Sequence, residues 1–223
     1  MLPLEPKIFH GRESELSDIL HLFKTEVPRI AILGVGGMGK TSLARAVLHH
    51  PDIMARYVQN RFFVVCVSAT TKLKLVNLIG DHLGLKPGKG LTWAVLQHFS
   101  NNPPSLLILD ELEMLWGPAS SCGDIEELLS LLTGVEYLAL MASQMASELY
   151  SQLTSSQITI RGAERSAKVP WTRPFLRALQ PLDQEAAYLI FADIADSDHS
   201  LEEVDKIPSL TINMPLAISL LAI

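Results

Sequence analysis

The sequence predicts an α/β domain whose central sheet is mostly parallel and is covered by helices on both faces. Short apolar runs alternate along the chain with stretches of helical periodicity, and no internal repeat is present. The apolar runs are unbroken, which is typical of strands buried on both sides in a parallel sheet. Strands are expected over residues 29–35, 61–69, 105–112 and 136–141, with a further short strand over 174–179.

Helices are expected between these strands, where apolar residues recur every three or four positions. The first covers residues 11–23, behind acidic residues that favour a helix start, and it ends before Pro28. The others are expected over 41–49, 73–83, 91–99 and 124–132, within 183–195, and across 202–223, where Pro208 and Pro215 interrupt the pattern. We therefore divide the chain into an N-terminal segment and helix (1–28), a sheet domain (29–180) and the truncated start of a small helical domain (181–223).

Composition narrows the class of protein. The chain has 223 residues, of which 48% are hydrophobic and 19% charged, so a sizeable core is available and apolar surface remains for contact with more protein. The net charge of −6 argues against a nucleic-acid or membrane-surface partner. Two cysteines suggest reduced thiols in a cytoplasmic protein. The apolar C-terminal stretch contains Asn213 and Pro215 and is shorter than the ~20 residues that span a bilayer, so no membrane segment is expected.

A glycine-rich stretch, GVGGMGKT, follows the first expected strand and matches the pattern G-x-x-x-x-G-K-[ST]. Such a loop wraps its backbone N–H groups around phosphate oxygens, and the following helix adds partial positive charge at its N-terminus. In this pattern the lysine reaches the β- and γ-phosphates and the hydroxyl joins Mg²⁺. The alternative is a glycine-rich turn without a ligand. The predicted nucleotide-binding residues of the loop are Gly34, Gly36, Gly37, Met38, Gly39, Lys40, Thr41 and Ser42.

Acidic and basic residues at later strand ends supply candidates for the chemistry of phosphate. Asp110 ends the third strand, where it would hold Mg²⁺ together with Thr41, and Glu111 follows it, placed to orient an attacking water. The alternatives are a solvated strand end and, for Glu111, a carboxylate that only tunes the metal shell. Arg161, in TIRG, is the candidate for sensing the γ-phosphate, because a guanidinium matches phosphate oxygens and stays charged. Neighbouring arginines are expected to be solvated.

Taken in order, these motifs resemble the STAND class of P-loop NTPases, the relatives of NB-ARC and NACHT domains, and within it a domain of large fungal multidomain proteins. FHGRESEL resembles the segment beside the adenine, and GVGGMGKTSLA resembles the phosphate loop. LLILDELE resembles the strand that holds Mg²⁺, and TIRG the sensor arginine. NMPLAISLL resembles the family's G-x-P-L-A motif. The resemblance covers nearly the whole chain and implies a P-loop three-layer sandwich that binds ADP or ATP with Mg²⁺.

The resemblance also assigns individual residues. It implies that Gly11 and Arg12 flank the base, that Arg161 senses phosphate and that Pro215 closes the adenine pocket. Pro215 could instead be a simple helix interruption. Two departures stand out. Residues 142–157 are polar and serine-rich, and they are either a surface insertion or retained intron sequence. The chain also stops inside the helix after Pro215, so the winged helix and the repeats of such proteins are expected to be missing from a fragment.

Two classes of function fit these residues. A signalling switch changes domain contacts with the bound nucleotide and needs slow hydrolysis or none. A P-loop enzyme, such as an ATPase or a small-molecule kinase, would need a second substrate pocket and a lid rich in arginine, and the sequence shows no such lid. An AAA+-like motor would need an arginine finger, which cannot be identified. The sequence favours the switch.

Overall fold

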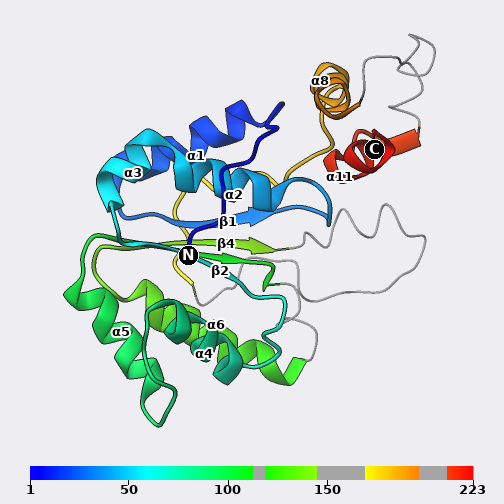
Figure 1. Ribbon diagram of the computed structural model, residues 1–223. Coiled ribbons are helices and arrows are strands. Elements are labelled where there is room, and N and C mark those ends of the chain that lie inside the picture. Colours follow the sequence, from blue (N-terminus) through cyan, green and yellow to red (C-terminus); the bar gives the residue numbers. More distant parts are fainter. Residues whose placement is uncertain (113–118, 145–168, 196–209, 223) are drawn as a thin grey trace.

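The computed structural model of the chain describes residues 1–112, 119–144, 169–195 and 210–222. Its centre is a sheet of four strands in the order β1-β4-β3-β2, and every pair is parallel (Figure 1). This confirms the predicted parallel sheet. The strands are β1 (Arg29–Leu33), β2 (Arg61–Val65), β3 (Ser105–Asp110) and β4 (Leu138–Gln144).

Helices cover both faces of the sheet, so the molecule has three layers (Figure 1). Alternate residues of each strand enter the two resulting cores: in β3, Leu106 and Ile108 face one helical layer, and Leu107 and Leu109 face the other. The first layer holds α1 (Glu13–Thr25), α2 (Lys40–His49) and α3 (Pro51–Tyr57), and the second holds α4 (Lys72–His82), α5 (Leu91–Asn101) and α6 (Ala119–Thr133). The predicted three-layer sandwich is confirmed.

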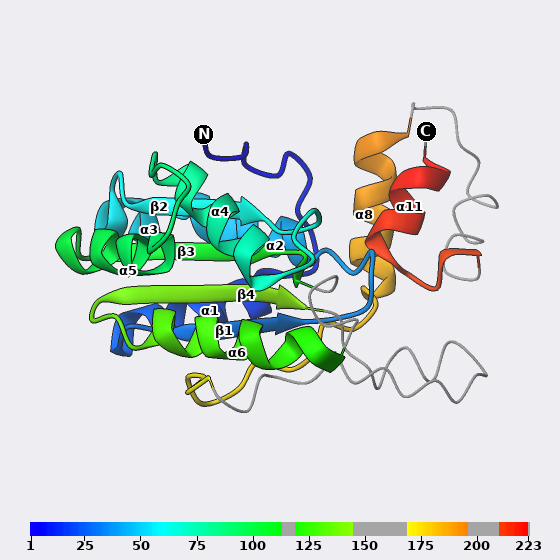
Figure 2. The same cartoon turned by 90° about the horizontal axis from the view of Figure 1, so that it is seen from below.

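A pair of helices, α8 (Gln184–Ile194) and α11 (Pro215–Leu221), lies beyond the carboxyl ends of the strands (Figure 2). The two helices pack on each other around a small core that includes Phe191 and Ile218. Asp183 begins α8 by accepting a hydrogen bond from the Ala186 N–H. This pair is the small helical part expected after the sheet.

The fourth strand is longer than the sequence analysis expected. Its predicted end was Met141, with an atypical polar segment beginning at the next residue, but β4 runs on to Gln144 and pairs with β1 from Leu140 to this end. Ala142 and Ser143 are buried. The strand therefore continues three residues past its predicted end, because the serine hydroxyl has partners inside the fold. Residues 145–157 lie outside the described residues.

Three smaller expectations are also corrected. The second strand ends at Val65, four residues earlier than predicted, and the expected strand at 174–179 is reduced to a single bridge between Gly34 and Leu179. Pro215 does not interrupt a helix but begins one, since a proline at the first helical position loses no hydrogen bond. None of the helices in the described ranges is long and apolar enough to cross a membrane.

Candidate nucleotide-binding site

The phosphate loop joins β1 to α2 at the carboxyl edge of the sheet. Gly37 and Gly39 have φ angles of 82° and 85°, a left-handed conformation that glycine adopts without strain. The loop is closed by a hydrogen bond from the Met38 N–H to the Val35 carbonyl, at 3.3 Å. The Met38 side chain is buried in the core, so its backbone is what it can offer a phosphate. The glycines thus give the loop the shape that the sequence motif predicts.

The other loop glycines differ in their surroundings. A Cβ on Gly36 would meet no atom within 4 Å, so the loop is open at this point. A Cβ on Gly34 would lie 3.2 Å from the Leu179 Cβ, because Gly34 forms the bridge with that residue. Gly34 is therefore a packing position as well as the start of the phosphate motif.

Lys40 begins α2 and is buried, with its side chain folded back over the loop. Its ammonium donates to the carbonyls of Gly34, at 3.0 Å, and of Val35, at 3.2 Å. A buried ammonium beside loop carbonyls and a helix N-terminus makes this end of the sheet attractive to an anion. Lys40 is thus positioned at the loop, as the motif requires.

Asp110 and Thr41, the two predicted magnesium ligands, are brought together. The Thr41 hydroxyl donates to Oδ2 of Asp110 at 2.8 Å, although the two residues belong to different elements. Asp110 is the last residue of β3 and is 1% exposed. A hydroxyl and a carboxylate are hard oxygen donors, the kind that Mg²⁺ prefers. These residues fit the ion.

Ser143 completes this cluster and was missed by the sequence analysis, which assigned it to the atypical segment. Its hydroxyl donates to Oδ1 of Asp110 and accepts a hydrogen bond of 2.9 Å from the backbone N–H of Glu111. Glu111 has a φ of 59°, which is uncommon for a residue with a side chain. A hydroxyl two positions after the apolar run of the fourth strand was the available signal. Arg161, the predicted sensor, lies outside the described residues.

A cavity of about 110 Å³ lies next to the loop, between the N-terminal segment and the helical pair. Several residues that were predicted to lie beside the nucleotide line this cavity. Its lining consists of Ile8, Phe9, His10, Arg12, Gly39, Ser42, Leu182, Ile190, Ile194, Pro215 and Ser219. Ser42, in the first turn of α2, and Pro215, at the start of α11, therefore border the same cavity.

Arg12 lies in the wall of this cavity, but its guanidinium is occupied by the protein. It is 6% exposed and donates to the carbonyls of Met38, at 3.2 Å, and Gln180, at 2.5 Å, and to the carboxylate of Glu15, at 3.0 Å. Arg12 therefore ties the phosphate loop to the segment that leads into α8. Its Nε has no hydrogen-bond partner in the described structure.

Gly11 and Pro215 hold the helical pair against the rest of the site. A Cβ on Gly11, whose φ is 71°, would lie 2.4 Å from the Cβ of Ala186 on α8. The residue after Pro215, Leu216, donates its backbone N–H to the Gly37 carbonyl at 3.2 Å. Both predicted residues thus lie where the helical pair meets the N-terminal segment and the phosphate loop.

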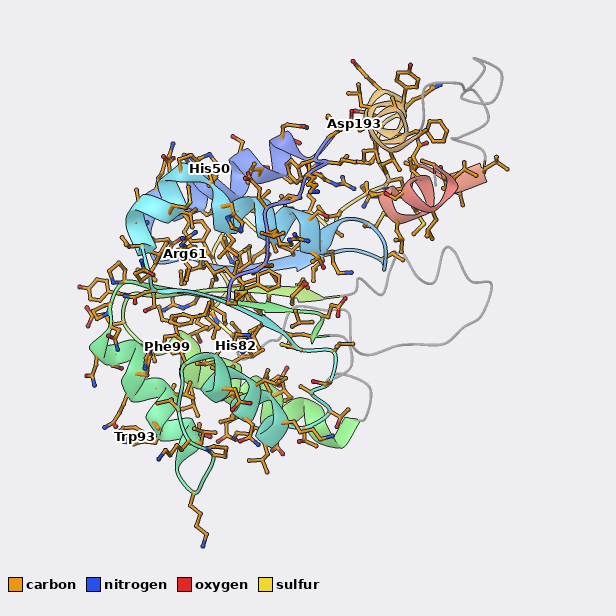
Figure 3. The ribbon with its side chains drawn as sticks, viewed as in Figure 1. His50, Arg61, His82, Trp93, Phe99 and Asp193 are labelled. Atoms are coloured by element: carbon orange, nitrogen blue, oxygen red, sulfur yellow. The ribbon has the colours of Figure 1, made fainter. Side chains whose placement is uncertain are left out.

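A polar contact that the sequence did not reveal lies in the same region. Nε2 of His10 lies 2.7 Å from Oδ2 of Asp193, and both side chains are partly exposed. Asp193 lies on the side of α8 that faces the N-terminal segment (Figure 3). His10 lines the cavity, so this pair spans its margin.

Residues 3–173 match the family described as Novel STAND NTPase 1. The chain belongs to this family. The match covers the phosphate loop, Asp110 and the N-terminal segment, and it confirms the STAND class that the motifs suggested. A search of curated proteins gave no match.

Solved structures share the fold at low sequence identity. The Walker-type ATPase PABY2304 of Pyrococcus abyssi has a TM-score of 0.65 at 14% identity, over 98% of this chain and 68% of that one. The Aeropyrum pernix ORC2 protein, solved with ADPNP and ADP, has a TM-score of 0.59 at 16% identity, over 86% and 53%. Drosophila ORC bound to DNA has a TM-score of 0.66 at 15% identity, over 99% and 56%. The chain thus spans between about half and two thirds of these chains' lengths, and the STAND protein has the fold of nucleotide-binding P-loop ATPases.

Proposed function

We propose that this STAND protein is a signalling switch that binds ADP or ATP with Mg²⁺ and hydrolyses nucleotide slowly or not at all. The observation that carries the proposal is the contact between the phosphate loop and the helical pair. Gly37 accepts a hydrogen bond from Leu216, and a Cβ on Gly39 would lie 3.8 Å from the Pro215 ring. A nucleotide in the loop and the adjoining cavity would touch both parts of the molecule, so its state can bias how they pack.

Each group of site residues is assigned to a different part of the nucleotide. Loop N–H groups and Lys40 would bind the β- and γ-phosphates. Ser42 and Pro215, which line the adjoining cavity, would lie beside the ribose and base. Thr41 and Asp110 would hold Mg²⁺, which would neutralise phosphate charge. Glu111 is the candidate for orienting water, and Arg161 for contacting the γ-phosphate.

The switch is favoured over a P-loop enzyme by what surrounds the loop. Among the residues that the structure describes, a pair of apolar helices lies at this end of the sheet, and none of these residues forms a lid rich in arginine (Figure 2). Leu216, Leu220 and Leu221 of α11 are exposed, which supports contact with further domains of a larger cytoplasmic chain. Such domains include the winged helix and repeats that the resemblance implies.

Calorimetry with ADP and with ATP tests binding. Lys40→Ala should abolish it, because the charge that faces the β- and γ-phosphates is lost. Lys72→Ala is the matched control: Lys72 pairs with Glu127 at 2.7 Å, begins α4 and lies outside the site, so binding should stay at the wild-type level. Equal affinities for wild type and Lys40→Ala would overturn the proposal.

Phosphate release at saturating ATP and Mg²⁺ separates the switch from the enzyme. We expect turnover well below about 1 s⁻¹, which is slow for an enzyme. A γ-phosphate arginine is worth about 10³–10⁵ in rate only when it is held in place. Faster turnover that disappears in Glu111→Gln would favour the P-loop enzyme.

A further inference from the structure

We propose that Ser143 is a positioning residue of the magnesium site, acting through Asp110 and the backbone of Glu111. This inference rests on the proposed binding of nucleotide with Mg²⁺ and assigns a role to a residue that the phosphate motif does not contain. Ser143 acts without touching the nucleotide: it sets the orientation of the carboxylate that would meet the ion.

The hydroxyl of Ser143 uses both of its hydrogen-bonding roles. A hydroxyl has one hydrogen to donate, and this one goes to Oδ1 of Asp110. Its oxygen accepts the N–H of Glu111. Because Oδ2 of Asp110 accepts from Thr41, each carboxylate oxygen has a hydroxyl donor, and the plane of the group is fixed.

The position of the hydroxyl follows from the strand. Side chains alternate along β4, and Ala139 and Met141 enter the core beneath α1 and α2. Ser143 continues this row and is 1% exposed, so its hydroxyl emerges on the face where α2 and the phosphate loop begin. The parallel pairing of β3 with β4 then brings it beside Asp110.

The same hydroxyl supports an uncommon backbone. Glu111 turns the chain out of β3 with a φ of 59°, in the left-handed region where a side chain is strained. Its N–H donates a hydrogen bond to the Ser143 hydroxyl. Loss of the hydroxyl would therefore free both the Asp110 carboxylate and the turn that carries Glu111.

The test is the gain in ATP affinity that Mg²⁺ produces, measured by calorimetry with Mg²⁺ and with EDTA. Removing a hydrogen-bond partner of a metal ligand typically costs 10–100-fold in metal affinity. We expect Ser143→Ala to reduce the Mg²⁺-dependent gain by at least about tenfold and to leave ATP affinity in EDTA unchanged. Ser143→Thr keeps a hydroxyl on a residue suited to strands and should retain the gain.

Two further variants keep the result interpretable. Ser105→Ala removes another buried strand serine, whose hydroxyl bonds Asn102 at the opposite end of the sheet, and should leave the gain unchanged. Ser143→Cys keeps the volume but is a weak donor, so it should lose the gain even if the alanine variant folds poorly. If Mg²⁺ raised the ATP affinity of Ser143→Ala or of Ser143→Cys as much as that of the wild type, the proposed role of Ser143 would be overturned. Absence of ATP binding in the wild type would instead overturn the proposed function.

Discussion

The two halves of the candidate site are built in different ways. The magnesium half, which comprises Thr41, Asp110, Glu111 and Ser143, stands on the ends of β3 and β4 and the first turn of α2. The base half, which comprises the cavity beside Pro215, lies between the N-terminal segment and the helical pair. Continuous β-ladders fix the first half. The second depends on a few hydrogen bonds and the small core around Ile218.

This difference suggests where a switch would move. The strand ends are buried on both faces, so the magnesium half should stay in place whichever nucleotide is bound. In the described part of the chain, Leu216 contacts Gly37 and Asp193 contacts His10, and Arg12 contacts Gln180 in the segment before α8. These are individual hydrogen bonds rather than β-ladders, so we expect the base half to be the part whose packing a nucleotide changes. The variants below act on one half at a time.

The largest effect is expected from Gly11→Ala, which disrupts the packing of the base half. The added Cβ would lie 2.4 Å from the Ala186 Cβ, and the residue would keep a left-handed φ of 71°. A strained backbone costs about 1–3 kcal/mol, and displacement of α8 adds to this. Thermal unfolding should show the lost stability, and calorimetry an ADP affinity lowered by at least about tenfold.

Gly84→Ala is the matched control for this variant. Gly84 has a similar φ of 68°, but a Cβ there would meet no atom within 4 Å. It should therefore lose stability through the backbone alone and keep its ADP affinity. If both variants bound ADP equally well, the packing of Gly11 against α8 would not matter for the base half.

Deletion of residues 142–157 tests the magnesium half. It joins Met141 to residues 158–160, Ile-Thr-Ile, which are strong strand formers and would replace residues 142–144 in β4. Thr159 then takes the register of Ser143 and supplies a hydroxyl to Asp110. We expect the midpoint of thermal unfolding to be unchanged or higher and the Mg²⁺-dependent gain in ATP affinity to persist. A clearly lower midpoint would mean that the segment is structural.

Pro215→Ala should have a smaller effect than Gly11→Ala, and this effect should be confined to the base half. The substitution removes apolar ring surface from the cavity wall and keeps a residue that suits the first turn of α11. Loss of one or two buried methylene groups costs about 1 kcal/mol, which is about fivefold in ADP affinity. Pro51→Ala, at the equivalent position of α3 and outside the cavity, should bind ADP as the wild type does. An unchanged ADP affinity of the Pro215→Ala variant would mean that the proline does not contact the bound nucleotide.

Among the substitutions in the base half, the smallest effect is expected from Asp193→Asn. Its partner His10 and Asp193 itself are both partly exposed, and such pairs contribute about 0–1 kcal/mol. ADP affinity should fall less than about fivefold. Glu127→Gln, which breaks the exposed pair with Lys72 away from the site, should leave affinity unchanged. A loss in Asp193→Asn as large as that in Gly11→Ala would show that this pair, rather than packing, holds the base half together.

The sequence alone determined the layers and the centre of the site. Unbroken apolar runs predicted strands buried on both faces, because only a parallel sheet covered twice removes all their side chains from water. The phosphate loop was recognisable because its glycines and Lys40 act through local backbone geometry. Asp110 was found because a carboxylate at the end of a buried strand interrupts an apolar pattern.

Only the tertiary structure decided which distant residues meet. The order β1-β4-β3-β2 puts Ser143 beside Asp110, and no local pattern encodes strand order. The sequence analysis ended the strand at Met141 because Ser143 is polar, yet its burial is stabilised by partners from β3 and the turn after it. The packing of the N-terminal segment likewise places Arg12 beside Met38 of the phosphate loop and Gln180 of the segment before α8. The docking of α8 pairs His10 with Asp193. Such contacts depend on the packing of elements far apart in the chain, which periodicity and motif spacing do not record.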